Sequence, residues 1–440
     1  MIYQAKELFT FLFILIPLFL ITGPAVPDLT ITFGVIFALL WILFKERDLN
    51  LLNENFIRIS LVLWLSLLFI SFFSFNKEKS FQDSIIFLRF LLIPIFFYFF
   101  YFKNNEKLNY LLLIIFLLVV FVSFDTFFQF FNYSSKNGFG TDIFGFKSSW
   151  YGRLTGPFGD ELVPGSYVSR FGLIGYVYLL TNKKLNKKIS LHSLYLGLVL
   201  VVCFISGERM AFATFGLGLF TLLIFLKKNR ITIISSIIIG LVTIFLINKF
   251  HPFYNDYNVI ESNQYHQGLK IEKIFKCEKN SEEICTKIID IQPSFLEVIK
   301  NFNSSAYGEI YLLSLTMFKD NLFTGVGINN FNYMCENRDN YRKMMVNYNC
   351  TSHPHNTYIQ WLAEGGLIVF VTFVLYLFFI CNFISTNSGD KKFKIISLVI
   401  LLIMFWPIMS TGSLIKNWYG ISVFFVIGIS LSISKLKNTI

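Results

Sequence analysis

Two histidines stand close together in the segment CTSHPHNTYIQWLAEGGLIVF, where a long polar stretch meets an apolar run. His353 and His355 are neutral near pH 7, and such an imidazole is the natural general base for a sugar hydroxyl. Asn356 could orient that base or hold a hydroxyl, and Glu364 lies nine residues beyond His355. A lone histidine at such a boundary is more often structural, and two at this spacing without nearby carboxylates are poor metal ligands. We therefore expect proton-transfer chemistry with neither a metal ion nor another cofactor.

A second group of polar residues lies near one side of the apolar runs. Ionisable groups in lipid are costly and are functional candidates by default. Any one of them alone is explained equally well by a structural ion pair or by a long side chain that extends to the membrane surface. Together they favour a net-positive cavity that faces outward. Arginine binds phosphates through a two-pronged fork and keeps its charge, which suits a diphosphate headgroup on a lipid tail. The residues are Arg89, Asp125, Gln129, Arg170 and Arg209, with Arg153 in the nearby segment RLTGPFGDELVPGS.

The elements that must position these residues are membrane helices. The 440 residues are only 15 % charged and 55 % hydrophobic, with a mean hydropathy of +0.60, and a typical globular chain is about 25 % charged. A transmembrane helix needs roughly 20 mostly apolar residues. Such runs predict an all-α integral membrane protein of about twelve spans, at 7–23, 28–44, 57–75, 81–102, 108–131, 165–181, 189–206, 210–226, 231–248, 356–380, 393–411 and 416–434.

Lysine and arginine in the short loops predict the orientation of these spans. The basic turn at 183–188 belongs inside, whereas the turn 23–28 has no base and belongs outside. The chain then divides into 1–248 (spans one to nine, with an outer loop at 132–164), a periplasmic loop domain at 249–355, and 356–440 (spans ten to twelve). Both ends lie in the cytoplasm.

The long segment and the cysteines agree with this topology. Residues 250–354 carry ten bases and twelve acids, so the surplus of positive charge lies in the membrane part and indicates anchoring, with no nucleic-acid partner. Helical patterns occur near 293–302 and 309–319. Four cysteines fall in this outer segment, where an oxidising compartment favours disulfides. Local pairing, Cys277 with Cys285 and Cys335 with Cys350, is the simplest of three connectivities, and zinc is a weaker alternative because no CxxC spacing is present.

The chain resembles the O-antigen ligase family, a superfamily that also contains O-antigen polymerases and protein O-oligosaccharyltransferases. The family signature is His, then Asn, Ser or Gln, then nine residues and Gly, and His355, Asn356 and Gly366 match it. Val369 departs from the trailing part of that pattern. The segments 153–167, 206–212 and 317–331 also look like the family, as does the plan of many spans with a late large loop. Many relatives carry an arginine near the position of Glu309, and Arg338 and Arg342 are candidates to replace it.

The resemblance implies metal-independent, inverting glycosyl transfer at the periplasmic face of the bacterial inner membrane. The donor would be a glycan on undecaprenyl pyrophosphate, and the acceptor a sugar hydroxyl of lipid A–core. His355 would be the general base and Arg209 its catalytic partner, while Arg153, Arg170, Arg89, Asn356 and Arg338 would bind substrate. A polymerase or a protein O-oligosaccharyltransferase would use similar chemistry with another acceptor. A lipid-linked glycan flippase is the rival of a different class, and it would need charged residues deep in the bundle.

Overall fold

Helices dominate the computed structural model of the protein. It describes residues 2–46, 53–102, 104–134, 138–148, 152–255, 258–266, 269–275, 288–290, 299–408 and 410–437. The longer helices are α1 (Ile2–Ile14), α2 (Ile16–Thr22), α3 (Ala25–Trp41), α4 (Asn55–Ser71), α5 (Lys77–Phe100), α6 (Asn105–Phe131), α7 (Pro164–Thr181), α8 (Ile189–Ile205), α9 (Arg209–Phe225), α10 (Arg230–Phe250), α13 (Ala306–Asp320), α16 (Thr357–Thr386), α17 (Lys391–Met404) and α18 (Asn417–Ser434).

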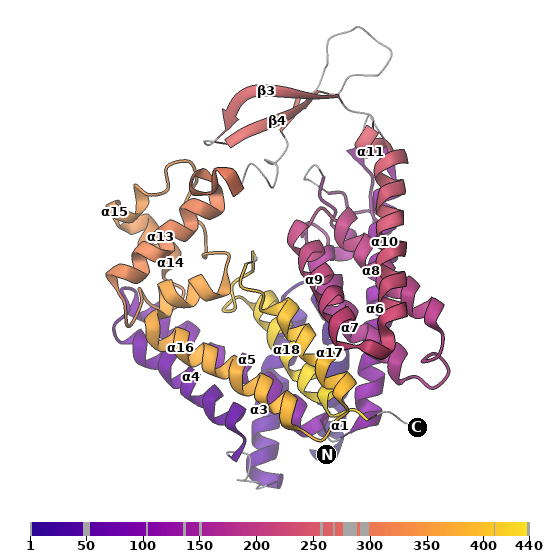
Figure 1. Ribbon diagram of the computed structural model, residues 1–440. Helices are drawn as coiled ribbons and strands as arrows, with labels where there is room; N and C mark the ends of the chain where they lie inside the picture. The colour runs from indigo at the N-terminus through magenta and orange to yellow at the C-terminus, as the bar shows by residue number, and fades with distance from the viewer. Residues whose placement is uncertain are drawn as a thin grey trace.

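Shorter elements connect them or lie at one end of the bundle. They are η1 (Ile42–Glu46), β1 (Tyr133–Ser134), β2 (Gly138–Phe139), η3 (Gly156–Phe158), η4 (Lys227–Asn229), α11 (Pro252–Asn255), β3 (Asn258–His266), β4 (Leu269–Phe275), β5 (Ile288–Asp290), η5 (Phe302–Ser304), α14 (Phe331–Asn337) and α15 (Asp339–Arg342). Both chain ends lie at the bottom of Figure 1, and α11, β3, β4 and α13–α15 lie toward the top. We call these the inner end and the outer end of the bundle.

Helix α18 lies at the centre of the bundle. All of its residues from Tyr419 to Ser434 are buried, and it packs against α5, α16 and α17. A helix that is apolar on every side belongs in such a position. Glycine permits the close approach, because a Cβ on Gly428 would lie 2.4 Å from the ring of Phe97. The other principal pairs are α4 with α16, α6 with α7, and α8 with α10.

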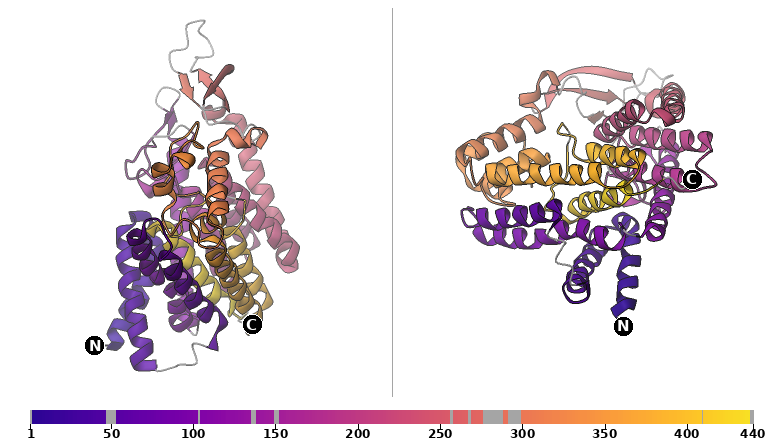
Figure 2. Two further views of the ribbon diagram at one scale, coloured as in Figure 1. Left: turned by 90° about the vertical axis from the view of Figure 1, so that its left-hand side faces the viewer. Right: turned by 60° about the horizontal axis from the view of Figure 1, so that its bottom comes forward.

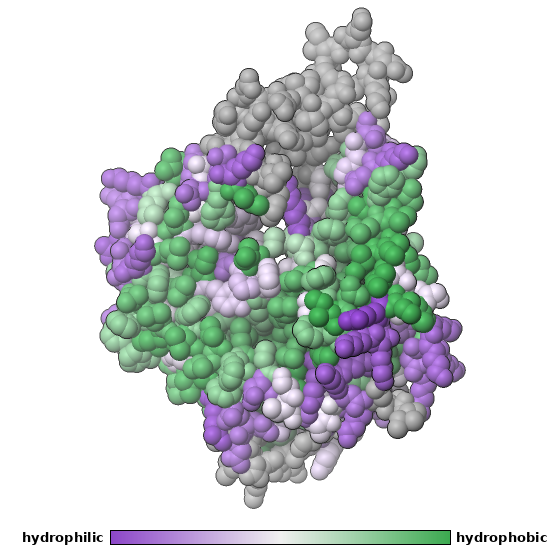
Figure 3. Space-filling model, viewed as in Figure 1, coloured by the Kyte–Doolittle hydropathy of each residue, from purple (hydrophilic) through white to green (hydrophobic). Residues whose placement is uncertain are grey.

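The protein is a helical membrane protein. Among the described residues, six helices are long and apolar enough to cross a membrane (α3 with η1, α5, α6, α10 with η4, α16 and α18), or seven if the bent pair α1–α2 is one span. Shorter apolar helices are α4, α8 and α9. Figure 3 shows an apolar band around the middle of the visible face, with hydrophilic residues toward both ends. Each of the twelve predicted runs overlaps a helix, and the count of twelve spans stays a prediction.

The helix in the eleventh predicted run, 393–411, ends earlier than the hydropathy of that run indicates. Helix α17 stops at Met404, and the part of 405–416 that the structure describes is not helical. Pro407 accounts for this, because proline lacks an N–H and disfavours helical conformation in the residue before it. The apolar residues 405–408 therefore extend the run without extending the helix, and they bring 405–416 to the outer end.

The outer end contains strands that an all-α prediction does not include. Strands β3, β4 and β5 form an antiparallel sheet in that order, with Asn258 opposite Phe275. Figure 2 shows these strands beyond the helices. The helical pattern near 309–319 corresponds to α13, whereas most of the pattern near 293–302 lies outside the described residues, as do Cys277 and Cys285.

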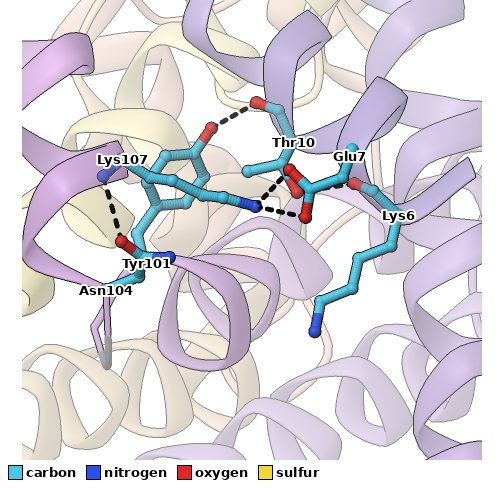
Figure 4. A network of polar contacts seen from close by, with 6 residues as sticks. All are labelled: Lys6, Glu7, Thr10, Tyr101, Asn104 and Lys107. Atoms are coloured by element: carbon cyan, nitrogen blue, oxygen red, sulfur yellow. Dashed lines mark hydrogen bonds and ion pairs between the residues drawn. The ribbon is translucent and has the colours of Figure 1, made fainter. Parts of the chain in front are cut away.

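At the inner end, a polar network ties α1 to the turn between α5 and α6 (Figure 4). The ammonium of Lys107 lies 2.8 and 2.9 Å from the carboxylate oxygens of Glu7. The hydroxyl of Tyr101 donates to the carbonyl of Thr10 at 2.5 Å, and the side chain of Asn104 accepts from the backbone N–H of Lys107 and caps α6. The Glu7 side chain is exposed, so the buried Tyr101 contact holds α1 more firmly than the ion pair does.

Candidate functional site

The histidine loop, residues 351–356, ends where α16 begins. Asn356 is the N-cap of α16, and its Oδ1 accepts from the backbone N–H groups of Tyr358 and Ile359 at 3.0 and 3.1 Å. Its Nδ2 donates to the carbonyl of Pro407 at 2.8 Å. A cap of this kind satisfies N–H groups that the first helical turn leaves unpaired. Asn356 therefore fixes the loop to both α16 and 405–416.

Both ring nitrogens of His353 are engaged. Its Nδ1 lies 2.9 Å from the hydroxyl of Ser352, and its Nε2 lies 3.3 Å from the carbonyl of Thr411. Because a carbonyl only accepts, Nε2 carries the proton and Nδ1 accepts from Ser352. Burial lowers the pKa of His353 to about 4, and the nearby His355 and Lys416 act in the same direction. His353 is thus a neutral group held in one tautomer.

His355 differs from its neighbour in both backbone and ring. Its φ of 55° is uncommon for a residue with a Cβ, and such strain gathers at functional sites. The backbone carbonyl of His355 accepts from the N–H of Thr411 at 2.7 Å. Its ring lies 4.1 Å from the ring of His353 and meets Tyr307 edge-on at 6.1 Å. The imidazole makes no hydrogen bond to any residue that the structure describes, and burial lowers its pKa.

Residues 405–416 lie along the first turns of α16 and complete the wall behind the histidines. The hydroxyl of Tyr358 donates to the carbonyl of Phe405 at 2.7 Å. The amide of Gln360 donates to the hydroxyl of Ser413 at 2.8 Å. These bonds explain how an early end to α17 positions the histidine loop.

Helix α16 is broken at the signature glycine. Gly366 has a φ of 61°, and a Cβ there would lie 2.4 Å from the carbonyl carbon and oxygen of Phe323. Loop 322–330 enters the break, where the N–H of Leu367 donates to Leu322 and the N–H of Val326 donates to Ala363, both at 2.9 Å. Only glycine tolerates this conformation and approach without strain. The signature from His355 to Gly366 therefore covers the first helical segment of α16. Asn356 caps the start of this segment, and Gly366 permits the break at its end.

Glu364 joins three parts of the outer end. Its buried carboxylate accepts from the N–H of Phe331 at 3.2 Å and from Nε2 of Gln360 at 2.9 Å. The Gln360 amide also reaches Ser413. The Glu364 carboxylate thus holds the start of α14, directly after loop 322–330, against α16, and it reaches 405–416 through Gln360. It acts here as a positioning group.

A charged cluster forms where the loop before α7 meets the turn before α9. Glu208 accepts hydrogen bonds from the N–H of Ser166 at 3.1 Å and from its hydroxyl. Burial raises the pKa of Glu208, while Ser166 and the charges of Arg153 and Arg170 oppose that rise. Arg153 donates from Nη2 to the carbonyl of Leu162 at 2.9 Å. Two positive groups therefore share one carboxylate.

The two guanidinium groups keep buried donors without a partner. Nε of Arg153 and Nη1 of Arg170 have no hydrogen-bond acceptor among the described residues. Unpaired buried donors are rare because each costs about 1–3 kcal/mol. With two arginines and one carboxylate, the cluster has a net positive charge and free N–H groups, which is the chemistry of an anion site.

Tyr419 connects this cluster to the histidine loop. The guanidinium of Arg170 lies 4.9 Å from the ring centroid of Tyr419 and 5.8 Å from that of Trp418. Thr357 and Thr411 lie beside the Tyr419 hydroxyl, and their own hydroxyls are 3.2 Å apart. Thr411 also holds the backbone of His355. One continuous set of contacts thus leads from Arg170 to His355.

The other predicted site residues have different surroundings. Arg209 begins α9 directly after Glu208, with an exposed side chain. Arg89 pairs with Asp28 at 2.6 Å and donates to Thr32 and Asn417 at 3.1 and 2.7 Å. Its charge is therefore already compensated. Arg338 is exposed, and its guanidinium lies 5.2 Å from the ring centroid of Phe75, between the outer helices and the α4–α5 turn.

Three residues at the site are not among those predicted from the sequence. Tyr419 and Thr411 belong to apolar runs, so their polar atoms were hidden by hydropathy. Lys416 lies close enough to His353 to influence its pKa, and it is exposed. The signal available for Lys416 was its position as a polar residue at the boundary of an apolar run, four residues after Gly412.

A disulfide and a buried glutamate shape the approach to the histidine loop. Cys335 and Cys350 are bonded, with their Cα atoms 5.8 Å apart, in accordance with local pairing. Glu309 lies in the first turn of α13 and accepts from Asn347, through the backbone N–H at 3.2 Å and through Nδ2 at 2.6 Å. Where many relatives would have an arginine, this chain thus has a residue that holds the segment before the histidines.

Metal ligands do not gather in the described part of the chain. No group of three or more His, Cys, Asp or Glu side chains there could hold a metal ion. Absence of a metal requirement stays a prediction from the chemistry of the site.

Comparison with known proteins connects this geometry to a family. Residues 194–374 match the family model described as O-Antigen ligase, and the chain therefore carries an O-antigen ligase family domain. The matched residues include Glu208, Arg209, loop 322–330, the histidine loop and Gly366. No curated protein matches the sequence. The family is one of O-antigen ligase- or polymerase-type glycan transfer.

Proposed function

We propose that the protein is an inverting glycosyltransferase of the O-antigen ligase type in the bacterial inner membrane. It would move a glycan from undecaprenyl pyrophosphate to a sugar hydroxyl of lipid A–core, with the site facing the periplasm. The bundle supplies a bilayer setting for the polyprenyl tail, and the outer end supplies a base and a positive cluster. The O-antigen ligase family domain supports a lipid-linked glycan as substrate.

His355 is the general base in this proposal. Its imidazole takes the proton from the acceptor hydroxyl as that oxygen bonds to the anomeric carbon of the donor. The bond from the anomeric carbon to the diphosphate oxygen breaks on the opposite face, which inverts the centre. The bonding electrons leave with the polyprenyl diphosphate, so no oxidant, reductant or metal is required.

The arginines bind and neutralise the diphosphate. Arg170 and Arg153 each carry a buried N–H donor without a partner among the described residues, as Arg89 does at Nε, and Arg209 follows Glu208 with an exposed side chain. Preorganised donors aimed at developing charge are usually the largest contribution to such catalysis. Arg89 contributes less directly, since Asp28 balances its charge. Asn356 acts by capping α16, and Arg338 would contact only a substrate that extends toward Phe75.

One observation carries the proposal: of two histidines separated by one proline, one has both ring nitrogens bonded and the other has neither bonded to a described residue. His353 is held by Ser352 and Thr411, whereas His355 lies next to it on a strained backbone. A half-buried imidazole with a lowered pKa in this setting is suited to accept a proton. The contacts through Tyr419 lead from it to Arg170.

Gel analysis of lipopolysaccharide from a deletion strain tests the acceptor. Loss of all polymer from lipid A supports a ligase. A ladder reduced to a single repeat indicates a polymerase, and unaltered lipopolysaccharide indicates a protein O-oligosaccharyltransferase or a function outside this class.

Complementation with two variants tests the mechanism. His355→Ala should reduce transfer by about 10²–10⁴-fold, the usual contribution of a placed base, while His353→Ala should keep more activity because it removes only an orienting group. Membrane levels of both variants are compared by immunoblot. Wild-type transfer by His355→Ala at a normal level would overturn the mechanism and favour a transport protein such as a flippase.

A further inference from the structure

A separate cavity opens at the inner end, far along the bundle from the histidine loop. It has a volume of about 230 Å³ and lies where the ends of α6, α7, α17 and α18 meet the α7–α8 and α9–α10 turns. The space exceeds that of several water molecules and fits a small group. Its lining residues are Asn105, Asn109, Leu180, Thr181, Asn186, Lys187, Asn229, Lys392, Phe393, Leu436 and Lys437.

The charge around this cavity is strongly one-sided. Lys187, Lys392 and Lys437 line it, and no acidic side chain from the part of the chain that the structure describes belongs to the lining. The charged neighbours of Lys392 are Asp390 and a further lysine, Lys228. Even with Asp390 counted, four lysines leave a net charge of about +3. Such a group of ammonium ions is stable only with an anion nearby or with extensive hydration.

The remaining lining suits a phosphate group attached to an apolar body. Asparagines from three segments, Asn109, Asn186 and Asn229, present amides that donate hydrogen bonds to phosphate oxygens. Asn229 is held in place, with its Nδ2 donating to the Tyr176 hydroxyl at 3.2 Å. Buried apolar side chains of Leu180 and Phe393 close the cavity on its inner side.

We propose that this inner cavity binds a phosphate-bearing anion, and that the ligand is the headgroup of an anionic phospholipid. Basic pockets between the ends of membrane helices are typical sites for such headgroups. The lipid source is favoured because the cavity adjoins the bundle surface. Tyr110, next to Asn109, is 56 % exposed, as is typical of a tyrosine at a membrane–water interface. Bound lipid would bridge α6, α7, α17 and α18 and stabilise the inner end.

Purified full-length protein in detergent tests this site. The melting temperature is measured with added phosphatidylglycerol, with phosphatidylcholine and with inorganic phosphate, and lipid retained by the protein is counted by native mass spectrometry. The triple variant Lys187→Gln, Lys392→Gln, Lys437→Gln removes the lining charges. The matched control Lys183→Gln, Lys184→Gln, Lys391→Gln removes three exposed lysines from the same end that do not line the cavity.

Phosphatidylglycerol should raise the melting temperature of the wild type and of the control, and phosphatidylcholine should not. Each lysine near a membrane surface is worth about fivefold in affinity, so the lining triple variant should bind about 100-fold more weakly and lose the shift. Asn109→Phe, which fills the cavity without changing charge, should also lose it. Equal shifts in both triple variants would overturn the site. A full shift with inorganic phosphate alone would overturn the lipid as its ligand.

Discussion

At the scale of single residues, the protonation of His355 determines the pH range of the proposed reaction. A general base must be neutral, so transfer should be lost as pH falls through the pKa of His355. Burial lowers that pKa below its ordinary value of 6.5. We therefore expect transfer to persist somewhat below pH 6.5 and then to fall. A pH–rate profile with reconstituted protein measures this, and a fall centred above pH 6.5 would contradict the assignment.

Arg170 provides a second test at this scale. Its guanidinium is stacked on Tyr419 and keeps a buried N–H without a partner among the described residues. Arg170→Ala should raise the KM for the diphosphate donor by about 10–100-fold, in line with the loss of one charge-assisted contact. Arg170→Lys should recover only part, because a point charge replaces a stacked fork.

The conservative change Arg58→Lys is the matched control, since Arg58 is exposed and bonds to the carbonyl of Asn53. It should leave the donor KM unchanged. An unchanged KM in Arg170→Ala would remove that arginine from the donor site.

The sequence alone identified residues with distinctive chemistry, but it did not predict which of them contact one another in the fold. His355 and Gly366 stand at a recognisable spacing, and Cys335 pairs locally with Cys350. The contact from Arg170 through Tyr419 to Thr411 joins three distant segments, and no local pattern encodes it. Asp28 likewise compensates Arg89 from another helix, so Arg89 could not be distinguished from Arg170 beforehand.

At the scale of elements, the break in α16 should be sensitive to any side chain. Gly366→Ala places a Cβ against the backbone of Phe323 at a φ of 61°. Left-handed strain and overpacking together should destabilise the protein by about 2–4 kcal/mol and displace loop 322–330. Gly216→Ala in α9 is the control, because nothing lies within 4 Å of its added Cβ. Equal melting temperatures for the two variants would show that α16 tolerates a side chain at the break.

The disulfide should stabilise the approach to the histidine loop. Cys335 and Cys350 close a loop of 15 residues, which is worth about 3 kcal/mol in the chain-entropy model. Replacing both with serine should lower the melting temperature and the transfer rate, while the protein still inserts in the membrane. The same loss after mild reduction of the wild type would confirm the cause. Unchanged stability in both experiments would mean that packing alone orders this segment.

Hydropathy predicts where helices occur better than where they end. Helix α17 stops before Pro407, although apolar residues continue beyond it. The functional consequence is large, since the non-helical residues after Met404 carry the bonds to Asn356 and His353. Similarly, α16 reads as one apolar run but contains a break that only the glycine pair at 365–366 hints at.

At the scale of the whole molecule, the placement of both chain ends constrains the topology. Both termini lie at the inner end (Figure 1), which is the placement that the predicted even number of spans requires. Six or seven described helices pass as spans by length and composition, and α4, α8 and α9 are shorter. Bent or short helices do not pass a length criterion even where their hydropathy is high, so the twelve apolar runs outnumber the helices that pass by length and composition.

The distribution of charge predicts which end faces the cytoplasm. Lysines gather at the inner end, around the cavity and in the α7–α8 turn, and cytoplasmic loops are enriched in lysine and arginine. Cysteine placed at exposed Asn186 should be protected from a membrane-impermeant maleimide in intact cells, and cysteine at exposed Asn303 should be labelled. Unmodified protein gives the background from native cysteines. Labelling of Asn186→Cys but not Asn303→Cys would reverse the orientation and put His355 in the cytoplasm, where an acceptor on the outer leaflet is out of reach.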